Sequence, residues 1–272
     1  MKLSISNIAW DEAFDQEMYI FLEKHSFDGI EIAPTRIWKE NPYDHIKEAK
    51  EYRARMSEKY NLHISSIQSI WFGRTERIFG SQEERQKLID YTQKAFEFAN
   101  VLGCKNIVFG CPKNRNIVTE RDSGVNEIAT GFFCKLAQLA KKKDTILSIE
   151  ANPPIYHTNY LNKTKDAVAL VRKVNHQGIA INYDLGTVLE NREAIEEIKD
   201  YIQFVNHVHI SEPELRPVAI GHVQENLCLN LKKLNYRNYI SIEMGNLNNI
   251  SKVQEICINL KKTVRGKLND MG

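Results

Sequence analysis

The chain has 272 residues, of which 42% are hydrophobic and 26% are charged, with a formal net charge of +2. This composition is that of an ordinary globular protein, and the near-neutral charge provides no electrostatic argument for a nucleic-acid or membrane partner. No apolar run approaches the roughly 20 residues that span a bilayer, and the start of the chain lacks the apolar core of a signal peptide. The five cysteines are scattered without a CxxC pair, so we expect reduced cysteines and a cytoplasmic protein.

Short β-branched runs alternate with longer amphipathic segments along the whole chain. Helical patterns cover about 15–25, 43–60, 81–103, 124–143, 164–174, 193–200, 222–234 and 249–263. In the third of these, Ser81 and Glu84 form a capping box and Gly103 is a suitable helix stop. The expected strands are Leu3–Ile8, Gly29–Ala33, His63–Ile70, Asn106–Phe109, Ile146–Glu150, Ile179–Asp184, Val205–Ile210 and Tyr239–Glu243.

Eight βα units in a chain of this length predict an α/β fold of the (β/α)8 TIM barrel type. No linker, low-complexity segment or repeat divides the sequence, so we expect one domain over residues 1–272. A doubly wound open sheet is the alternative, and it would often carry a glycine-rich phosphate turn after the first strand. The first strand here runs into NIAWDE, which contains no glycine.

Four consecutive expected strands end in side chains that can bind a metal. The segments LSIE, INYD, HVH and SIE end at Glu150, Asp184, His209 and Glu243. Active sites of TIM barrels lie where the carboxyl ends of the strands converge, so these four side chains are expected to meet there. A single carboxylate at a strand end is usually a solvated residue, but four such ends in succession predict a site.

The chemistry of this set favours a divalent cation. Three crowded carboxylates raise one another's pKa unless a counter-charge is present. Carboxylates with one imidazole suit one divalent ion, Mn²⁺, Mg²⁺ or Co²⁺, with Zn²⁺ as an alternative. The surplus negative charge would keep a carboxylate basic enough to remove a proton from bound substrate. His207 would lie deeper on the same strand face, as a core residue or a partner of the site, and Glu31 would line the barrel or pair with a base.

The order of these strand ends resembles the xylose-isomerase-like TIM barrel superfamily. The segments DGIEIAP, NIVFGCPKNR and YISIEMG carry the resemblance across most of the chain, and FGCPKNR and YISIEM are most similar to bacterial sugar phosphate isomerase/epimerase proteins. The superfamily includes ketose 3-epimerases, hydroxypyruvate isomerases, inosose dehydratases and apurinic endonucleases. The resemblance implies a metal-dependent sugar or sugar-phosphate isomerase or epimerase.

In ketose 3-epimerases the matching residues hold the metal, and the two glutamates act as acid and base. The resemblance therefore assigns α-proton removal and return, through an enediolate, to Glu150 and Glu243. It also implies that Arg216 holds substrate, although the segment is one residue longer than the usual epimerase spacing. Tyr156 stands where those enzymes often have a second glutamate, and we expect it to contact substrate. Thr187 replaces a histidine of the epimerase pattern, so a particular ketose substrate does not transfer.

Further residues near the expected rim are candidates for contact with substrate. Gln68 would point toward the pocket, and Trp71 would form an apolar wall or close the top of the barrel. Lys113 and Arg115 would bind a phosphate or carboxylate, or lie in a solvated loop. His222, at the start of a helix, would contact substrate or serve the helix terminus.

Other functions remain open at this stage. A dehydratase acting on an inosose-like keto-polyol would use the same metal quartet, and a non-catalytic sugar-binding barrel would keep the fold without the chemistry. A trinuclear apurinic endonuclease is disfavoured because IAP, SIWFG and VFGCP contain no histidine. We expect a small-molecule sugar partner, no nucleic acid and no membrane, and a homo-oligomer remains open.

Overall fold

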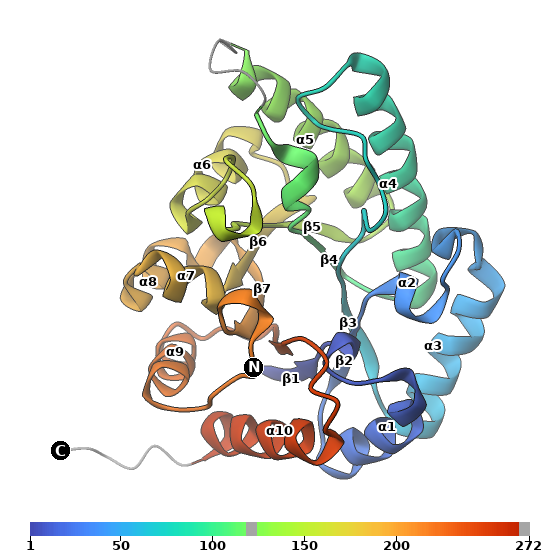
Figure 1. Ribbon diagram of the computed structural model, residues 1–272, viewed down its shortest axis with the longest axis vertical. Helices are drawn as coiled ribbons and strands as arrows, with labels where there is room; N and C mark the ends of the chain where they lie inside the picture. Colours follow the sequence, from blue (N-terminus) through green and yellow to red (C-terminus); the bar gives the residue numbers. More distant parts are fainter. Residues whose placement is uncertain (118–123, 267–272) are drawn as a thin grey trace.

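The computed structural model describes residues 1–117 and 124–266, in which eight parallel strands form a nearly closed barrel inside a ring of helices (Figure 1). The expected domain extent of 1–272 includes residues outside this description. The strands pair in the order β1-β8-β7-β6-β5-β4-β3-β2. Their bounds are β1 Lys2–Ile5, β2 Gly29–Ile32, β3 His63–Ile67, β4 Asn106–Phe109, β5 Ile146–Glu150, β6 Ile179–Asp184, β7 Val205–Ser211 and β8 Tyr239–Glu243.

The helices cover the outer face of the barrel with their apolar sides. In α5, Phe133, Leu136 and Ala140 recur at helical spacing and are buried. The capping box of Ser81 and Glu84 begins α4, and Gly103 ends it at φ 68°. The bounds are α1 Asp15–Lys24, α2 Pro34–Ile37, α3 Ile46–Tyr60, α4 Gln82–Leu102, α5 Val125–Lys142, α6 Thr164–Val174, α7 Leu185–Asn191, α8 Ile198–Tyr201, α9 His222–Lys233 and α10 Ile250–Arg265.

The seam between β1 and β2 is sparsely paired. The two strands share one isolated bridge, between Ser6 and Glu31. Asp28 reinforces it, because its main-chain N–H donates to Leu3 O at 2.9 Å and its carboxylate accepts from Leu3 N at 2.7 Å. This bridge holds Glu31 at the carboxyl end of β2, beside the end of β1.

The interior of the barrel is more polar than the branched aliphatic filling usual for this fold. At the start of β4, the amide of Asn106 donates to Ser66 Oγ at 2.9 Å and its oxygen accepts from Ser148 Oγ at 2.5 Å. The hydroxyls of Ser4 and Ser65 are 2.6 Å apart. Hydrogen bonds thus satisfy buried groups that would otherwise carry a desolvation cost. The large apolar core lies instead between the strands and the helices.

The expected (β/α)8 barrel is confirmed, with differences at the ends of elements. β1 stops at Ile5, because Asn7–Ala9 turns into a 3-10 helix, and β3 stops at Ile67 before an irregular loop. The segment expected as a helix at 193–200 is a 3-10 turn followed by the short α8, and α7 was not expected. Within the described residues, the structure has no helix that is long and apolar enough to cross a bilayer.

Candidate metal centre

Side chains from four neighbouring strands converge at the carboxyl end of the barrel. Glu150 ends β5, Asp184 ends β6, His209 lies near the end of β7 and Glu243 ends β8. Each offers one ligand atom, and these four atoms lie within 4.8 Å of one another. Parallel strands deliver their terminal side chains to the same rim, so the convergence follows from the register between β5 and β8.

Two asparagines hold the carboxylate of Glu150. Asn152 donates to Oε1 at 2.7 Å, and Asn182 donates to Oε2 at 2.6 Å. Gly110 leaves room for this carboxylate, because a Cβ at that position would lie 3.0 Å from Glu150 Oε1. The carboxylate is therefore fixed from both sides, and its orientation depends on Gly110 after β4, on Asn182 in β6 and on Asn152 in the loop after β5.

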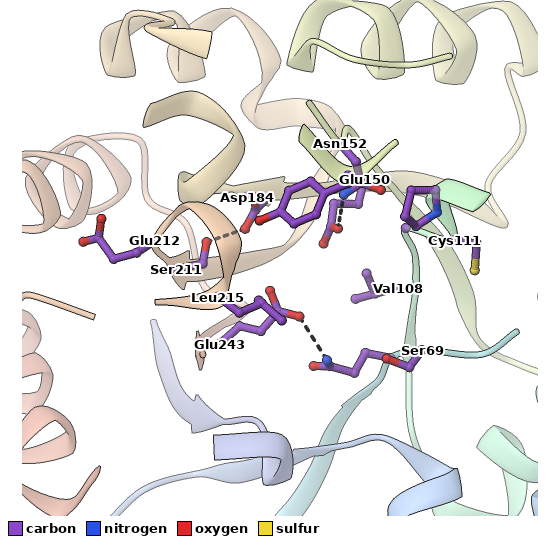
Figure 2. A pocket seen from close by; sticks show the side chains of 14 residues that line it. Ser69, Val108, Cys111, Glu150, Asn152, Asp184, Ser211, Glu212, Leu215 and Glu243 are labelled. Atoms are coloured by element: carbon purple, nitrogen blue, oxygen red, sulfur yellow. Dashed lines mark hydrogen bonds between the residues drawn. The ribbon is translucent and has the colours of Figure 1, made fainter. Parts of the chain in front are cut away.

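The other two carboxylates also have donors of their own. Asp184 accepts hydrogen bonds from the hydroxyl of Ser211 and, at 2.7 Å, from the main-chain N–H of Thr187. Gln68 donates to Glu243 Oε1 at 2.9 Å. Figure 2 shows both side-chain contacts together with the bond from Asn152 to Glu150. These bonds keep the carboxylates in place around a common centre.

His209 is oriented by a buried glutamate on the far side of its ring. Its Nε2 lies 3.0 Å from Glu31 Oε1, while its Nδ1 lies 3.2 Å from both Glu150 Oε2 and Glu243 Oε2. His207 Nε2 lies 3.0 Å from the second oxygen of Glu31. A proton on Nε2 of His209, donated to Glu31, leaves the lone pair of Nδ1 facing the carboxylates, which is the arrangement of many metal-bound histidines.

The protonation equilibria show that the negative charges compete. Burial, with the charges of Glu150 and Asp184, raises the pKa of Glu243 to about 7 against the opposing effect of His209. Burial and the charge of Glu150 also raise the pKa of Asp184. The pKa of Glu150 is lowered although burial opposes this, because His209, Asn152 and Asn182 stabilise its anion.

The pKa values of His209 and Glu31 are shifted by the charges of their neighbours. Burial disfavours the charged form of His209, but Glu243 and Glu31 outweigh it and raise the pKa of its imidazole well above the ordinary value. For Glu31, burial opposes ionisation, but the two histidines prevail and lower the pKa. Positive charge at the centre of the cluster therefore stabilises the carboxylates, and in the absence of an ion protons supply it.

These residues fit a divalent cation. Three carboxylates and one imidazole, each held by hydrogen bonds to neighbouring residues, suit a cation with oxygen preference such as Mn²⁺, Mg²⁺ or Co²⁺. A dication would replace the protons on His209 and on the raised carboxylates. The buried Glu, Asp and His cluster can therefore bind a metal ion.

A cavity of about 160 Å³ opens over this cluster (Figure 2). The expected substrate contacts Gln68 and Tyr156 both lie in its lining. The hydroxyl of Tyr156 accepts the main-chain N–H of Glu214 at 2.8 Å, which connects the loops after β5 and β7. The cavity lining comprises Gln68, Ser69, Val108, Gly110, Cys111, Pro112, Glu150, Asn152, Tyr156, Asp184, Ser211, Glu212, Leu215 and Glu243.

Arg115 lies behind the cavity and not in it. Its side chain is fully buried, with Nη1 donating to the main-chain oxygen of Glu150 and Nη2 to Asn152 Oδ1, each at 2.8 Å. The guanidinium thus supports Glu150 and Asn152, and the structure does not place it where the expected anion of a substrate would bind. A local pattern such as CPKNR cannot reveal this, because the partners are more than 30 residues away.

The structure does not bring the remaining three expected contacts into this cavity. Trp71 is buried, donates from Nε1 to Thr92 Oγ1 at 2.8 Å and packs on Phe109, so it closes the outer core. Arg216 is exposed and donates to Pro213 O, while its neighbour Leu215 lines the cavity. His222 is exposed at the first position of α9.

Sequence reasoning did not identify several residues that shape the site. Asn152 and Asn182 each lie two residues from a strand-end carboxylate, and Ser211 lies two residues after His209. In a strand, residues two apart share a face, so this spacing was the available signal for Asn182 and Ser211. Asn152 lies in a loop, where only the fold shows its direction.

Comparison with known proteins agrees with this architecture. A family model described as "Xylose isomerase-like TIM barrel" matches residues 21–262. A search of the curated proteins gives no match. Among solved structures, 3-keto-D-glucoside 4-epimerase (YcjR) from E. coli is similar with a TM-score of 0.77 and 18% identity, over 97% of this chain and 99% of that one.

Two further structures show the same fold. D-psicose 3-epimerase, crystallised in the presence of D-fructose, has a TM-score of 0.78 and 16% identity over 97% of this chain and 99% of its own. An AP endonuclease of family 2 from Brucella melitensis has a TM-score of 0.71 and 17% identity over 90% and 93% of the two chains. At these identities the similarity establishes the fold alone. The match of the family model over most of the sequence shows that the chain belongs to the xylose isomerase-like TIM barrel family.

Proposed function

We propose that this protein is a divalent-metal-dependent isomerase or epimerase that acts on a sugar by removal and return of an α-proton. The observation that carries the proposal is the placement of Glu150 and Glu243. Both carboxylates are buried, both approach His209 Nδ1 to 3.2 Å, and they come from strands separated by β6 and β7 around the rim. The names of two similar structures, a keto-glucoside epimerase and a psicose epimerase, support the same class of reaction.

Glu150, Asp184, His209 and Glu243 would hold the cation. When bound, a divalent ion supplies positive charge beside the carbonyl oxygen of the substrate, which acidifies the neighbouring C–H bond. One glutamate then removes the α-proton to give an enediolate, and the other returns a proton. Return to the same carbon from the opposite face gives epimerisation, and return to the adjacent carbon gives isomerisation.

The surrounding residues support these two roles. Asn152 and Asn182 hold Glu150, and Gln68 holds one oxygen of Glu243, so each glutamate keeps a fixed direction while its proton moves. The pKa of about 7 for Glu243 places its proton exchange near neutral pH in the metal-free site. Fixed carboxylates on two sides of the cavity would confine the reacting carbon between them.

We favour a neutral sugar over a sugar phosphate as the substrate. Glu212 adds a fourth carboxylate to the cavity lining, beside Glu150, Asp184 and Glu243. A phosphate dianion placed here would lie against this negative surface, with only partial compensation from a bound dication. The hydroxyls and amides of Ser69, Tyr156 and Gln68 are suitable partners for the hydroxyl groups of a neutral sugar.

Proton exchange in D₂O tests the proposal directly. The Mn²⁺-loaded protein is incubated with a panel of ketoses, aldoses and their phosphates, and NMR identifies which C–H bond exchanges. Glu150→Gln and Glu243→Gln should each reduce exchange by roughly 10²–10⁴-fold, the usual effect of losing a general base. Glu214→Gln, the same substitution on the exposed loop after β7, is the matched control.

Two outcomes would change the conclusion. Near wild-type exchange in either glutamine variant would contradict a two-base mechanism. Accumulation of an ultraviolet-absorbing enone or dione would indicate loss of a β-hydroxyl, and would assign the site to a dehydratase acting on a keto-polyol.

A further inference from the structure

A second cavity lies on the same rim of the barrel, next to the candidate metal centre. Its volume is about 460 Å³, and it is bordered by Ile8 after β1, Ala33 after β2 and Asn246 after β8. Ser69, after β3, lines both this cavity and the one that contains the carboxylates. The two cavities are therefore adjacent compartments over one end of the barrel, and they meet at Ser69.

The most unusual feature of the second cavity is Phe72. Its side chain is 70% exposed, the highest value among the exposed large hydrophobic residues of the described chain. The turn that carries it is well anchored, because Phe72 N donates to Ser69 O and Arg74 N donates to Trp71 O. Trp71 itself is buried and bonded to Thr92. An aromatic ring held at the edge of a cavity by a fixed turn can pack against the apolar face of a ligand.

The rest of the cavity combines an apolar floor with polar edges. Trp10 is 2% exposed and Ala33 is 4% exposed, so the floor is formed by well-packed residues. Trp10 donates from Nε1 to Asp15 at 2.9 Å, and Arg36 bonds both Asp15 and the main-chain oxygen of Trp10. Asp11, Lys39 and Asn246 provide charged and amide groups around this floor. Such a combination suits a sugar ring, which has an apolar face and a rim of hydroxyl groups.

We infer that this second cavity is a subsite for a second sugar ring, so that the substrate is a disaccharide or glycoside whose keto-sugar unit occupies the metal centre. The inference rests on the proposed function for the position of the reacting unit. Phe72 would cover the apolar face of the second ring, and the glycosidic linkage would pass beside Ser69. Because a monosaccharide would fill only the inner cavity, Phe72 would contribute to binding of the longer ligand alone.

Direct binding measurements test the subsite without requiring turnover. Calorimetric titration of the full chain in Mn²⁺ compares D-fructose with four disaccharides that end in fructose and differ in linkage: lactulose, turanose, maltulose and isomaltulose. At least one disaccharide should bind about tenfold more tightly than fructose, or about 1.4 kcal/mol. Phe72→Ala should remove this advantage and leave fructose binding within about twofold, whereas Phe72→Trp should retain it.

A control substitution separates a sugar subsite from a general effect of losing an exposed aromatic ring. Phe14→Ala removes another exposed phenylalanine, 40% exposed and absent from the described lining of both cavities, and should have no effect. The inference is overturned if no disaccharide binds more tightly than fructose, or if Phe72→Ala weakens both ligands equally. It is also overturned if Phe72→Ala changes the oligomeric state in light scattering, since Phe72 would then cover a second copy of the chain. Failure of proton exchange with every sugar, with the disaccharide preference intact, would instead reject the proposed function.

Discussion

Glu31→Gln is the substitution that most directly tests how the metal centre is built. Glu31 is fully buried, and its two oxygens lie 3.0 Å from the Nε2 atoms of His209 and His207. A glutamine has the same shape but offers one acceptor and one donor where the carboxylate offers two acceptors. One of the two histidines must then face an N–H group. If that histidine is His209, its proton moves to Nδ1, toward Glu150 and Glu243. If it is His207, His209 keeps an acceptor but loses the charged partner that raises the basicity of its Nδ1.

The expected loss can be estimated from these contacts. Removing a hydrogen-bonded partner of a metal-bound histidine lowers metal affinity by roughly 10- to 100-fold, which corresponds to about 1.4–2.7 kcal/mol. The stability of the metal-free protein should also fall, because a charge-assisted hydrogen bond contributes about 1.5–3 kcal/mol. The loss of affinity is thus expected to exceed tenfold while the barrel stays folded.

Mn²⁺ affinity is measured by calorimetry and by competition with a fluorescent chelator, and unfolding by urea gives the stability of the metal-free form. Glu48→Gln is the matched control, because Glu48 also pairs with a histidine, His45 at 3.5 Å, but on the exposed surface of α3. The Mn²⁺ affinity of this variant should equal that of the wild type. A folded Glu31→Gln protein that binds Mn²⁺ within about twofold of the wild type would refute the view that Glu31 orients His209.

Four further results are expected. Asp184→Asn should lower bound Mn²⁺ in elemental analysis, and full occupancy would remove Asp184 from the ligand set. Metal at 100 times its dissociation constant should raise the free energy of unfolding by about 2.7 kcal/mol over that of the metal-free protein. Equal melting curves with and without metal would contradict this. Because the raised pKa of Glu243, about 7, means that a proton must leave before metal binds, Mn²⁺ affinity should rise between about pH 6 and pH 8; a constant affinity would reject this. Arg115→Lys should lower stability by roughly 1–3 kcal/mol, because a lysine lacks the two-nitrogen fork with which the guanidinium donates to Glu150 O and to Asn152 Oδ1. Unchanged stability with weaker binding of an anionic sugar would instead place Arg115 on the substrate.

The sequence alone was sufficient for the barrel and for the convergence of the four strand-end side chains. Alternation of β-branched runs with amphipathic segments is a local pattern, and it predicts eight βα units. In such a barrel every strand points its carboxyl end toward one rim, so the position of Glu150 or Glu243 at the end of a strand determines its location. The ends of β1 and β3 were less predictable, because Asn7–Ala9 and the loop after Ile67 turn where hydrophobic residues continue.

Tertiary structure decided the roles of residues outside the strands. The ligands lie in the strands themselves, whereas the segments after the strands carry Arg115, Trp71, Arg216 and His222. The geometry of those segments directs Arg115 and Trp71 into the protein and leaves the other two exposed. The pairing of Glu31 with His209 joins residues 178 positions apart, and only closure of the barrel between β1 and β2 brings them within 3.0 Å. Strand periodicity sets the direction of a side chain within its own strand, whereas contacts across the barrel and within loops depend on packing of segments distant in the sequence.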